Sequence, residues 1–311
     1  RIFYNYGIIL SKIGNIKEAE IYQRKAIKIN PYFAEAHNNL GNILRQLGKS
    51  KEAEISYRKA IEIKPDYAKA HSNLGVILRD LGKLKDAENS YSNAISLKPD
   101  DTYTIMNRSQ LFFDKGELEL ALKDAESCNT KFSRAFSLEI LFALGRIDEI
   151  YERIKKNSKL DEMNIKIAAL SSFLKEQENK ITANNFCNNP LSFLHFSNLK
   201  FHHKDYDVFL KKIMNELSEL KTIWEPLNKS THNGFQTPTN INLFANSSEN
   251  ISYLKSIILN ELDCYYLKFE KENCSYIQKW PSKKNLKAWH VILKKQGYQE
   301  AHIHPSGWLS G

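Results

Sequence analysis

The sequence is short of three features that would each identify a class of protein. Its 311 residues include four cysteines, and no two of them form a Cys-x-x-Cys pair. A disulfide-stapled scaffold is therefore excluded, and reduced thiols in a cytoplasmic protein are expected. No run of about 18 apolar residues occurs, so we predict no transmembrane helix and no membrane partner. The formal net charge is +9, but the basic residues form no block or stripe, and we expect no nucleic-acid partner.

The first 130 residues contain a 34-residue repeat. Small residues and prolines recur in fixed registers: Gly7, Gly41 and Gly75; Gly14, Gly48, Gly82 and Gly116; Ala19, Ala53, Ala87 and Ala121; Pro31, Pro65 and Pro99. Small residues allow two helices to cross closely, and a proline ends the second helix. This pattern is typical of tetratricopeptide (TPR) repeats. We predict a TPR α-solenoid of four repeats over residues 1–130, followed by a degenerate helix pair at 132–157 with Gly145 in its turn.

Four asparagines follow the same period: Asn5, Asn39, Asn73 and Asn107. Asparagine is a mediocre helix former, so helix formation alone does not explain its recurrence. Its amide offers a donor and an acceptor, which suits the repeating amides of an extended peptide. The spacing resembles the asparagine ladder in the TPR groove of O-linked N-acetylglucosamine transferases. We therefore predict that these residues line a groove for an extended peptide or protein; the alternative is that each amide caps or is solvated locally.

The second half of the sequence has a different pattern. Residues 131–221 are predicted to form a degenerate TPR and helical linker, with helices at 165–174 and 205–221. Residues 231–238 are expected to form a loop, and 251–269 another helix. Two strands, 286–293 and 298–302, are predicted on either side of a turn at 295–297. The histidine pair at 202–203 is expected to be solvated.

Two further histidines, His302 and His304, alternate at the end of the last predicted strand. Side chains alternate along a strand, so both imidazoles lie on one face and can chelate one metal ion. The surrounding motifs resemble the 2-oxoglutarate/Fe(II)-dependent oxygenases found C-terminal to TPR arrays. The matching segments are Trp224-Glu-Pro226, His232-Asn-Gly-Phe-Gln-Thr237 with Leu243-Phe244, Trp280-Pro281, Ala288-Trp289, Gly297-Tyr-Gln299 and His302-Ile-His-Pro-Ser-Gly-Trp-Leu-Ser-Gly311.

This resemblance implies the start of an antiparallel double-stranded β-helix, or jelly roll, over residues 222–311. It also implies a ferrous ion on His302 and His304, with 2-oxoglutarate as cosubstrate. The usual first motif is His-x-Asp or His-x-Glu, and here His304 occupies the carboxylate position. Two readings follow: an all-histidine site, or a site in which one of these two histidines binds iron. The remaining ligand and the arginine that binds 2-oxoglutarate are expected beyond Gly311.

A mainly α-helical protein is therefore predicted, with a dioxygenase that hydroxylates a substrate recruited by the TPR array. The first alternative is a non-enzymatic TPR interaction module. A TPR-linked glycosyltransferase is a weaker one, because residues after 160 lack the strand–helix alternation with glycine-rich turns of a doubly wound domain. A zinc hydrolase or a metal-free cupin-like barrel would share the His-x-His entry.

Overall fold

The computed structural model describes residues 1–187, 189–224, 231–238, 242–245 and 247–299. The chain divides into two compact units, one from Arg1 to Ile150 and one from Tyr151 onward, and the boundary falls inside a helix. Within the described ranges, no helix is both long enough and apolar enough to cross a membrane. Each unit is described by itself below.

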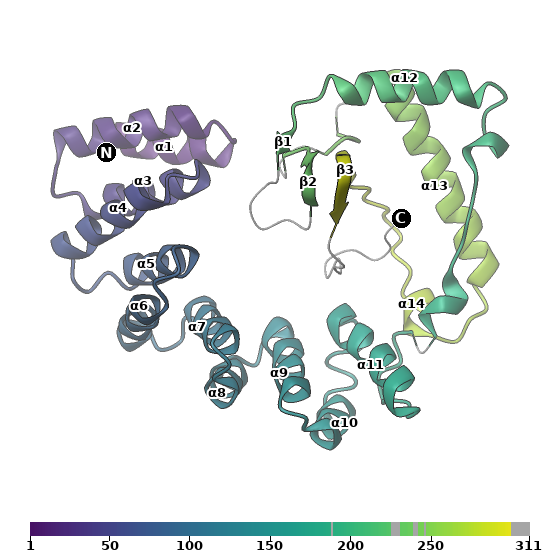
Figure 1. The fold of residues 1–311 in the computed structure, drawn as a ribbon, viewed down its shortest axis with the longest axis horizontal. Helices are drawn as coiled ribbons and strands as arrows, with labels where there is room; N and C mark the ends of the chain where they lie inside the picture. Colours follow the sequence, from purple (N-terminus) through teal and green to yellow (C-terminus); the bar gives the residue numbers. More distant parts are fainter. Residues whose placement is uncertain (188, 225–230, 239–241, 246, 300–311) are drawn as a thin grey trace. The chain divides into compact units, whose positions relative to one another are not determined.

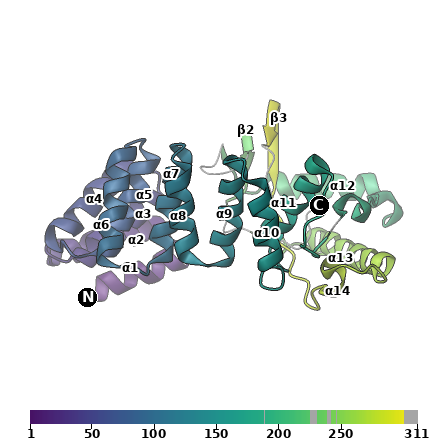
Figure 2. The ribbon, with the colours of Figure 1, turned by 90° about the horizontal axis from the view of Figure 1, so that it is seen from below.

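The first unit is an array of antiparallel helix pairs (Figure 1; Figure 2). Its helices are α1 (Ile2–Lys12), α2 (Ile16–Ile29), α3 (Ala34–Gln46), α4 (Ser50–Ile63), α5 (Ala68–Asp80), α6 (Leu84–Leu97), α7 (Thr102–Asp114), α8 (Leu118–Cys128), α9 (Lys131–Ala143) and the start of α10 (Ile147–Lys156). Helices α3, α5, α7 and α9 lie on the inner side of the arc, and α4, α6 and α8 on the outer side (Figure 1). Successive odd-numbered helices α1, α3, α5 and α7 also contact one another. The repeat array predicted from the 34-residue period is therefore present.

Size complementarity fixes how the two helices of a pair cross. A Cβ atom added at Gly41 would lie 2.5 Å from the ring of Tyr57, and one at Gly75 would lie 2.6 Å from the ring of Tyr91. Both tyrosines are fully buried. The glycine thus lets a large ring lie directly against the backbone of the first helix, which explains the predicted pattern of small residues. In the fourth pair both residues are small, with Ser109 at the glycine position and Ala125 at the tyrosine position.

Glycines with positive φ form the turn inside each pair. Five occur, with φ between 72° and 86°: Gly14, Gly48, Gly82, Gly116 and Gly145. Glycine adopts this left-handed conformation without the cost that a Cβ would add. Gly145 lies between α9 and α10, so the fifth, degenerate helix pair predicted at 132–157 is confirmed.

The second unit, described from Tyr151 to Gln299 with the gaps given above, combines helices with a small sheet. Its elements are α11 (Ile165–Glu178), the 3₁₀ turns η1 (Pro190–Phe193) and η2 (Leu199–Phe201), α12 (Tyr206–Ser218), β1 (Ile223–Trp224), β2 (Thr231–Gln236), α13 (Glu249–Phe269), α14 (Ser275–Gln278) and β3 (Val291–Gln299). The three strands pair antiparallel in the order β1-β2-β3. An aromatic cluster around Tyr265, Phe269 and Tyr276 forms one core of this unit.

The structure corrects two predictions in this unit. Residues 231–236 form strand β2 rather than a loop, because Gly234 permits a close strand approach instead of a turn: a Cβ there would lie 2.8 Å from the Ile292 carbonyl oxygen. Residues 295–297 form a bulge in β3 rather than a hairpin turn. His232 pairs with Tyr298 and Gly234 with Leu293, so both flanks of the bulge pair with β2.

The bulge is held by a side chain of β2. Asn233 donates a hydrogen bond from Nδ2 to the carbonyl oxygen of Lys295, at 2.8 Å. Strand β3 also begins at Val291, five residues later than predicted at 286. The described strands form one small sheet, and the double-stranded β-helix stays a prediction.

Candidate peptide-binding groove

The four predicted groove asparagines lie on the odd-numbered helices, but their environments differ. Asn73 donates from Nδ2 to Oδ1 of Asn38 in the preceding repeat, at 2.9 Å. The amide of Asn73 therefore links two repeats, which is a structural role rather than a free binding group. Asn39 is half-buried and Asn5 is exposed. Asn107 differs from all three because it lines a groove.

This groove has a volume of about 470 Å³ and is lined by helices of the inner side. Its lining comes from α5, α7 and the start of α9: Arg79, Thr102, Tyr103, Met106, Asn107, Gln110, Thr130 and Phe132. Two aromatic side chains are more than half exposed there, Tyr103 at 57% and Phe132 at 51%. An aromatic ring left exposed in a concave site offers apolar area to a ligand at low entropic cost.

The Asn107 amide is an incomplete hydrogen-bonding group. Its Nδ2 is buried and has no hydrogen-bond partner among the described residues. Most buried polar atoms are satisfied, so this donor is one that a water or a bound group would complete. The sequence prediction for Asn107 thus agrees with its position in the groove, while the peptide that would bind there stays a prediction.

A tyrosine beside the groove also lacks a partner, and the repeat pattern shows why. In the second repeat the hydroxyl of Tyr57 donates to Oδ1 of Asn42 at 2.9 Å. One repeat later, Val76 replaces that asparagine, and the buried hydroxyl of Tyr91 has no partner within the described chain. Burial raises the pKa of both tyrosines above the usual range, so both hydroxyls stay protonated.

The groove carries one formal charge. Arg79 is the only ionisable cation among the lining residues, and no aspartate or glutamate lines the groove. Nothing in the described part of the chain forms an ion pair or hydrogen bond with the Arg79 guanidinium. Its equivalent one repeat earlier, Arg45, is also half-buried and also unpaired within the described ranges. An unpaired guanidinium with five donors favours a carboxylate or phosphate ligand.

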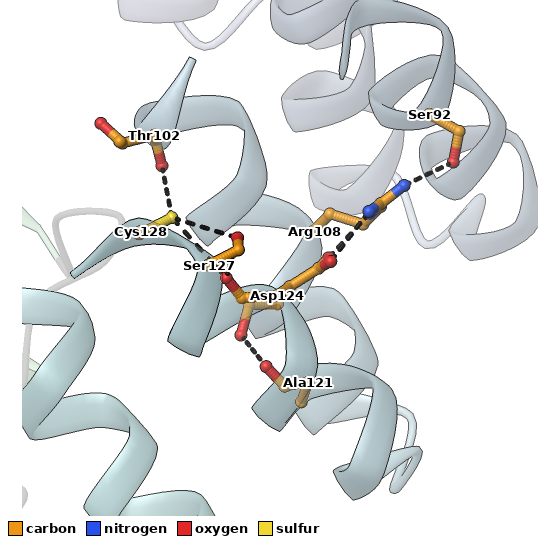
Figure 3. Close-up of polar contacts among 8 residues, drawn as sticks. Ser92, Thr102, Arg108, Ala121, Asp124, Ser127 and Cys128 are labelled. Carbon is orange, nitrogen blue, oxygen red and sulfur yellow. Dashed lines mark hydrogen bonds and ion pairs between the residues drawn. The ribbon is translucent and has the colours of Figure 1, made fainter. Parts of the chain in front are cut away.

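A polar clamp holds the central helix of the groove in place (Figure 3). Arg108 of α7 donates from Nε and Nη2 to the two carboxylate oxygens of Asp124 on α8, at 2.7 and 2.8 Å, and from Nη1 to Ser92 Oγ on α6 at 3.2 Å. Ser109 Oγ donates to the Ala121 carbonyl oxygen at 2.6 Å. Arg108 occupies the position of the buried Leu40 and Leu74. Sequence reasoning missed this clamp, although the break in a leucine register was its signal.

A cysteine lies beside this clamp at the end of α8. Cys128 Sγ lies 3.9 Å from the carbonyl oxygen of Thr102, the first residue of α7 (Figure 3). Burial raises the pKa of this thiol, so the protonated thiol is favoured and its reactivity is low. The described cysteines are all free.

Several histidines outside the predicted metal site have structural contacts. His37 and His71 each place Nε2 2.9 Å from the carbonyl oxygen of the proline six residues earlier. The expectation that 202–203 is solvated is wrong, since His202 Nε2 lies 2.8 Å from Glu261 Oε1 and the ring of His203 stacks on Phe209. His195 binds the other oxygen of Glu261 at 2.9 Å, and this hydrogen bond lowers the pKa of that carboxyl.

The predicted metal ligands cannot be placed. His302 and His304 lie outside the described residues. Among the residues that the structure does describe, no group of three histidine, cysteine, aspartate or glutamate side chains is arranged to hold a metal ion. The ferrous ion and 2-oxoglutarate therefore remain expectations from the resemblance.

Comparisons with known proteins agree with the architecture of the first unit. Tetratricopeptide repeat family models match residues 1–33, 34–67 and 68–101. No curated protein matches the chain. A solved structure of MamA is 19% identical, covers 55% of this chain and 96% of its own, and has a TM-score of 0.46. The structure of MamA 41-end from Desulfovibrio magneticus RS-1 is 15% identical, with coverages of 51% and 93% and a TM-score of 0.47. YrrB, described as a TPR protein with an unusual peptide-binding site, is 19% identical, with coverages of 49% and 83% and a TM-score of 0.43. Residues 1–101 therefore consist of tetratricopeptide repeats.

Proposed function

We propose that the first unit is a protein-interaction module that binds an extended peptide segment along its inner side. The observation that carries this proposal is the groove itself, in which the exposed rings of Tyr103 and Phe132 flank the unsatisfied amide of Asn107. Concave faces of solenoid repeats are the usual binding surfaces of such proteins. Amide groups satisfy a peptide backbone, and exposed rings bury its side chains.

Selection of peptides on the intact protein tests this function. A display library of random dodecapeptides would be enriched on the immobilised chain, and the dissociation constant of each recovered peptide measured by fluorescence anisotropy. We expect Phe132→Ala to weaken binding roughly tenfold or more, because burial of an aromatic ring contributes about 1.5–3 kcal/mol. Asn107→Ala should weaken it as well, through loss of the amide contact.

Phe142→Ala is the matched control, because Phe142 lies on the same helix, is 39% exposed and does not line the groove. Peptides that bind Phe132→Ala and Asn107→Ala as tightly as the unmodified protein would contradict the proposal. A library that yields no enriched peptide would contradict it too.

A second candidate function is an Fe(II)/2-oxoglutarate-dependent hydroxylase whose substrate is the polypeptide recruited by the repeats. Its support is the ordered set of motifs in the last 90 or so residues together with one feature of the fold. The motif at 232–237 lies largely on β2, and β2 pairs antiparallel with β3, the strand that precedes His302 and His304 along the chain. An antiparallel barrel is built from such pairs. The described residues hold no metal site, so no catalytic step follows from them.

Iron content and cosubstrate turnover test this second candidate. The protein purified from its complete gene would be analysed for bound iron and then assayed for succinate formation from 2-oxoglutarate. We expect about one iron per chain, lost in His302→Ala, because a non-haem iron site of this class needs its histidine ligands. His71→Ala is the control, since His71 contacts a proline carbonyl in the repeats. Iron-free protein that also forms no succinate when Fe(II) is added would contradict this function.

A further inference from the structure

The chemistry of the groove defines its ligand more narrowly than peptide binding alone. We propose that it selects a segment in which an acidic side chain and a large apolar side chain lie about four residues apart, the acid over α5 and the apolar group over α7 and α9. This proposal rests on the peptide-binding function above. It assigns the ligand's side-chain chemistry and its direction along the array.

The acidic residue follows from charge complementarity. Arg79 is the one charged group of the lining and forms no ion pair or hydrogen bond within the described structure. The adjacent Asp80 is exposed, lies outside the lining and forms no ion pair with Arg79. A carboxylate entering the groove therefore meets a cation and no opposing anion. A planar guanidinium binds a carboxylate with two parallel hydrogen bonds, which adds geometric selectivity to the charge.

The direction of the ligand follows from the repeat register. The position held by Arg45 in α3 and Arg79 in α5 is held by Phe113 in α7, one repeat further along. The ring of Phe113 packs against Phe136 of α9 at 5.4 Å between centroids. At this register position the side chain thus changes from cationic on α3 and α5 to aromatic on α7, where it packs against an aromatic ring of α9. A bound segment matches this order only when its acidic end lies toward α3 and its apolar end toward α9.

The spacing follows from helix packing. Neighbouring packed helices lie about 8–10 Å apart, and an extended chain advances about 3.3 Å per residue. The apolar side chain would lie between Tyr103 of α7 and Phe132 of α9, about one and a half helix spacings from Arg79 on α5. This distance corresponds to about four residues, so the acid and the apolar residue would be separated by about three others.

Degenerate peptide pools on the intact chain test the selectivity. Three fluorescein-labelled pools would carry fixed Glu-x-x-x-Phe, Gln-x-x-x-Phe or Glu-x-x-x-Ala, with no acidic residue at the variable positions. We expect the Glu/Phe pool to bind about tenfold more tightly than the other two by fluorescence anisotropy. The glutamate preference should vanish in Arg79→Gln and shrink as salt rises from 0.1 to 1 M, because the Debye length falls from about 10 to about 3 Å.

Arg58→Gln is the matched control. It removes the same charge from α4, where Arg58 pairs with Glu54 at 2.9 Å and lies outside this groove. The glutamate preference should survive in this variant. If it is lost equally in both variants, net charge alone attracts the peptide, and the assignment to Arg79 is overturned.

Two further outcomes separate this proposal from the function on which it rests. If the Glu/Phe and Gln/Phe pools bind equally and both lose affinity in Phe132→Ala, peptide binding stands and the acidic selectivity is overturned. If no pool binds and the random library also yields no ligand, both are overturned. A reversed peptide, Phe-x-x-x-Glu, that binds as tightly as the original would overturn the assigned direction.

Discussion

At the scale of single residues, changes within a helix pair are matched across it. Gly41 and Gly75 face Tyr57 and Tyr91, Gly7 faces Gln23, and the same two positions of the fourth pair hold Ser109 and Ala125. Polar groups are matched less completely. Tyr57 is satisfied by Asn42, whereas Val76 leaves the Tyr91 hydroxyl without a partner in the described residues. A large side chain on the second helix therefore always faces a glycine on the first, whereas its hydrogen bond is not always kept, which agrees with the high packing density of protein interiors.

The matching of volumes gives a testable prediction at Gly75. We expect Gly75→Ala to lower the free energy of unfolding by about 1–3 kcal/mol, because its methyl group would lie 2.6 Å from the Tyr91 ring and the ring would have to move. Urea denaturation followed by circular dichroism measures this change. In a Tyr91→Ala background the same substitution should cost much less, and equal costs in both backgrounds would show that the ring is not the obstacle.

At the scale of whole elements, neighbouring repeats are joined by a ladder of ion pairs. Glu20, Glu54 and Glu88 follow the 34-residue period. They pair with Lys49, Lys83 and Lys115 of the next repeat at 3.0, 2.8 and 2.7 Å. The third lysine lies two residues earlier than the period requires, because Glu117 occupies the equivalent position. The ladder therefore persists although its register shifts.

This ladder predicts how stability depends on pH. Burial alone would raise the pKa of Glu20 and Glu54, but hydrogen bonds from Lys49 and Lys83 and from Arg24 and Arg58 lower it below the ordinary value of 4.5. A lowered folded pKa contributes stability that is fully present above the unfolded pKa and is lost as pH falls through the folded pKa. We therefore expect the melting temperature to fall less steeply below about pH 4.5 when both glutamates are replaced by glutamine.

Thermal melts of this double variant between pH 7 and pH 3 test the expectation. Glu35→Gln is the control, because Glu35 forms no ion pair among the described residues. Its pH profile should remain parallel to that of the unmodified protein. Identical acid slopes for the double variant and the unmodified protein would show that the ladder contributes nothing to acid stability.

At the scale of the whole molecule, the fold of the first unit was predicted from the sequence more completely than the fold of the second. The repeats were predictable because each position of the pattern recurs in four repeats. Gly145 alone extended the pattern to a fifth pair. Asn107 belongs to the same repeated pattern and lines the groove, and its contact with a peptide stays a prediction. Arg79 and Phe132 were not predicted as groove residues, because the groove was predicted only from the four asparagines that follow the 34-residue period.

The second unit was less predictable because its strand pairing is nonlocal. The pattern of residues near 295–297 indicates a turn, and a local pattern does not show that both flanks pair with a strand about 60 residues away. Glycine at 234 was equally ambiguous, since it serves a turn or a close strand contact. Helices α11, α12 and α13 were predicted near their observed positions, because helical periodicity is a property of a single segment.

The size match within each helix pair limits where genetic recombination can join two repeats of this array. The two positions of each match lie 16 residues apart, Gly41 with Tyr57 and Ser109 with Ala125, on opposite sides of the glycine turn. A crossover between repeats preserves every match. A crossover inside the turn would join the Ser109 helix to a tyrosine-bearing helix, or a glycine-bearing helix to the Ala125 helix, producing a collision or a void. The natural unit of duplication and shuffling in this chain is therefore the complete helix pair.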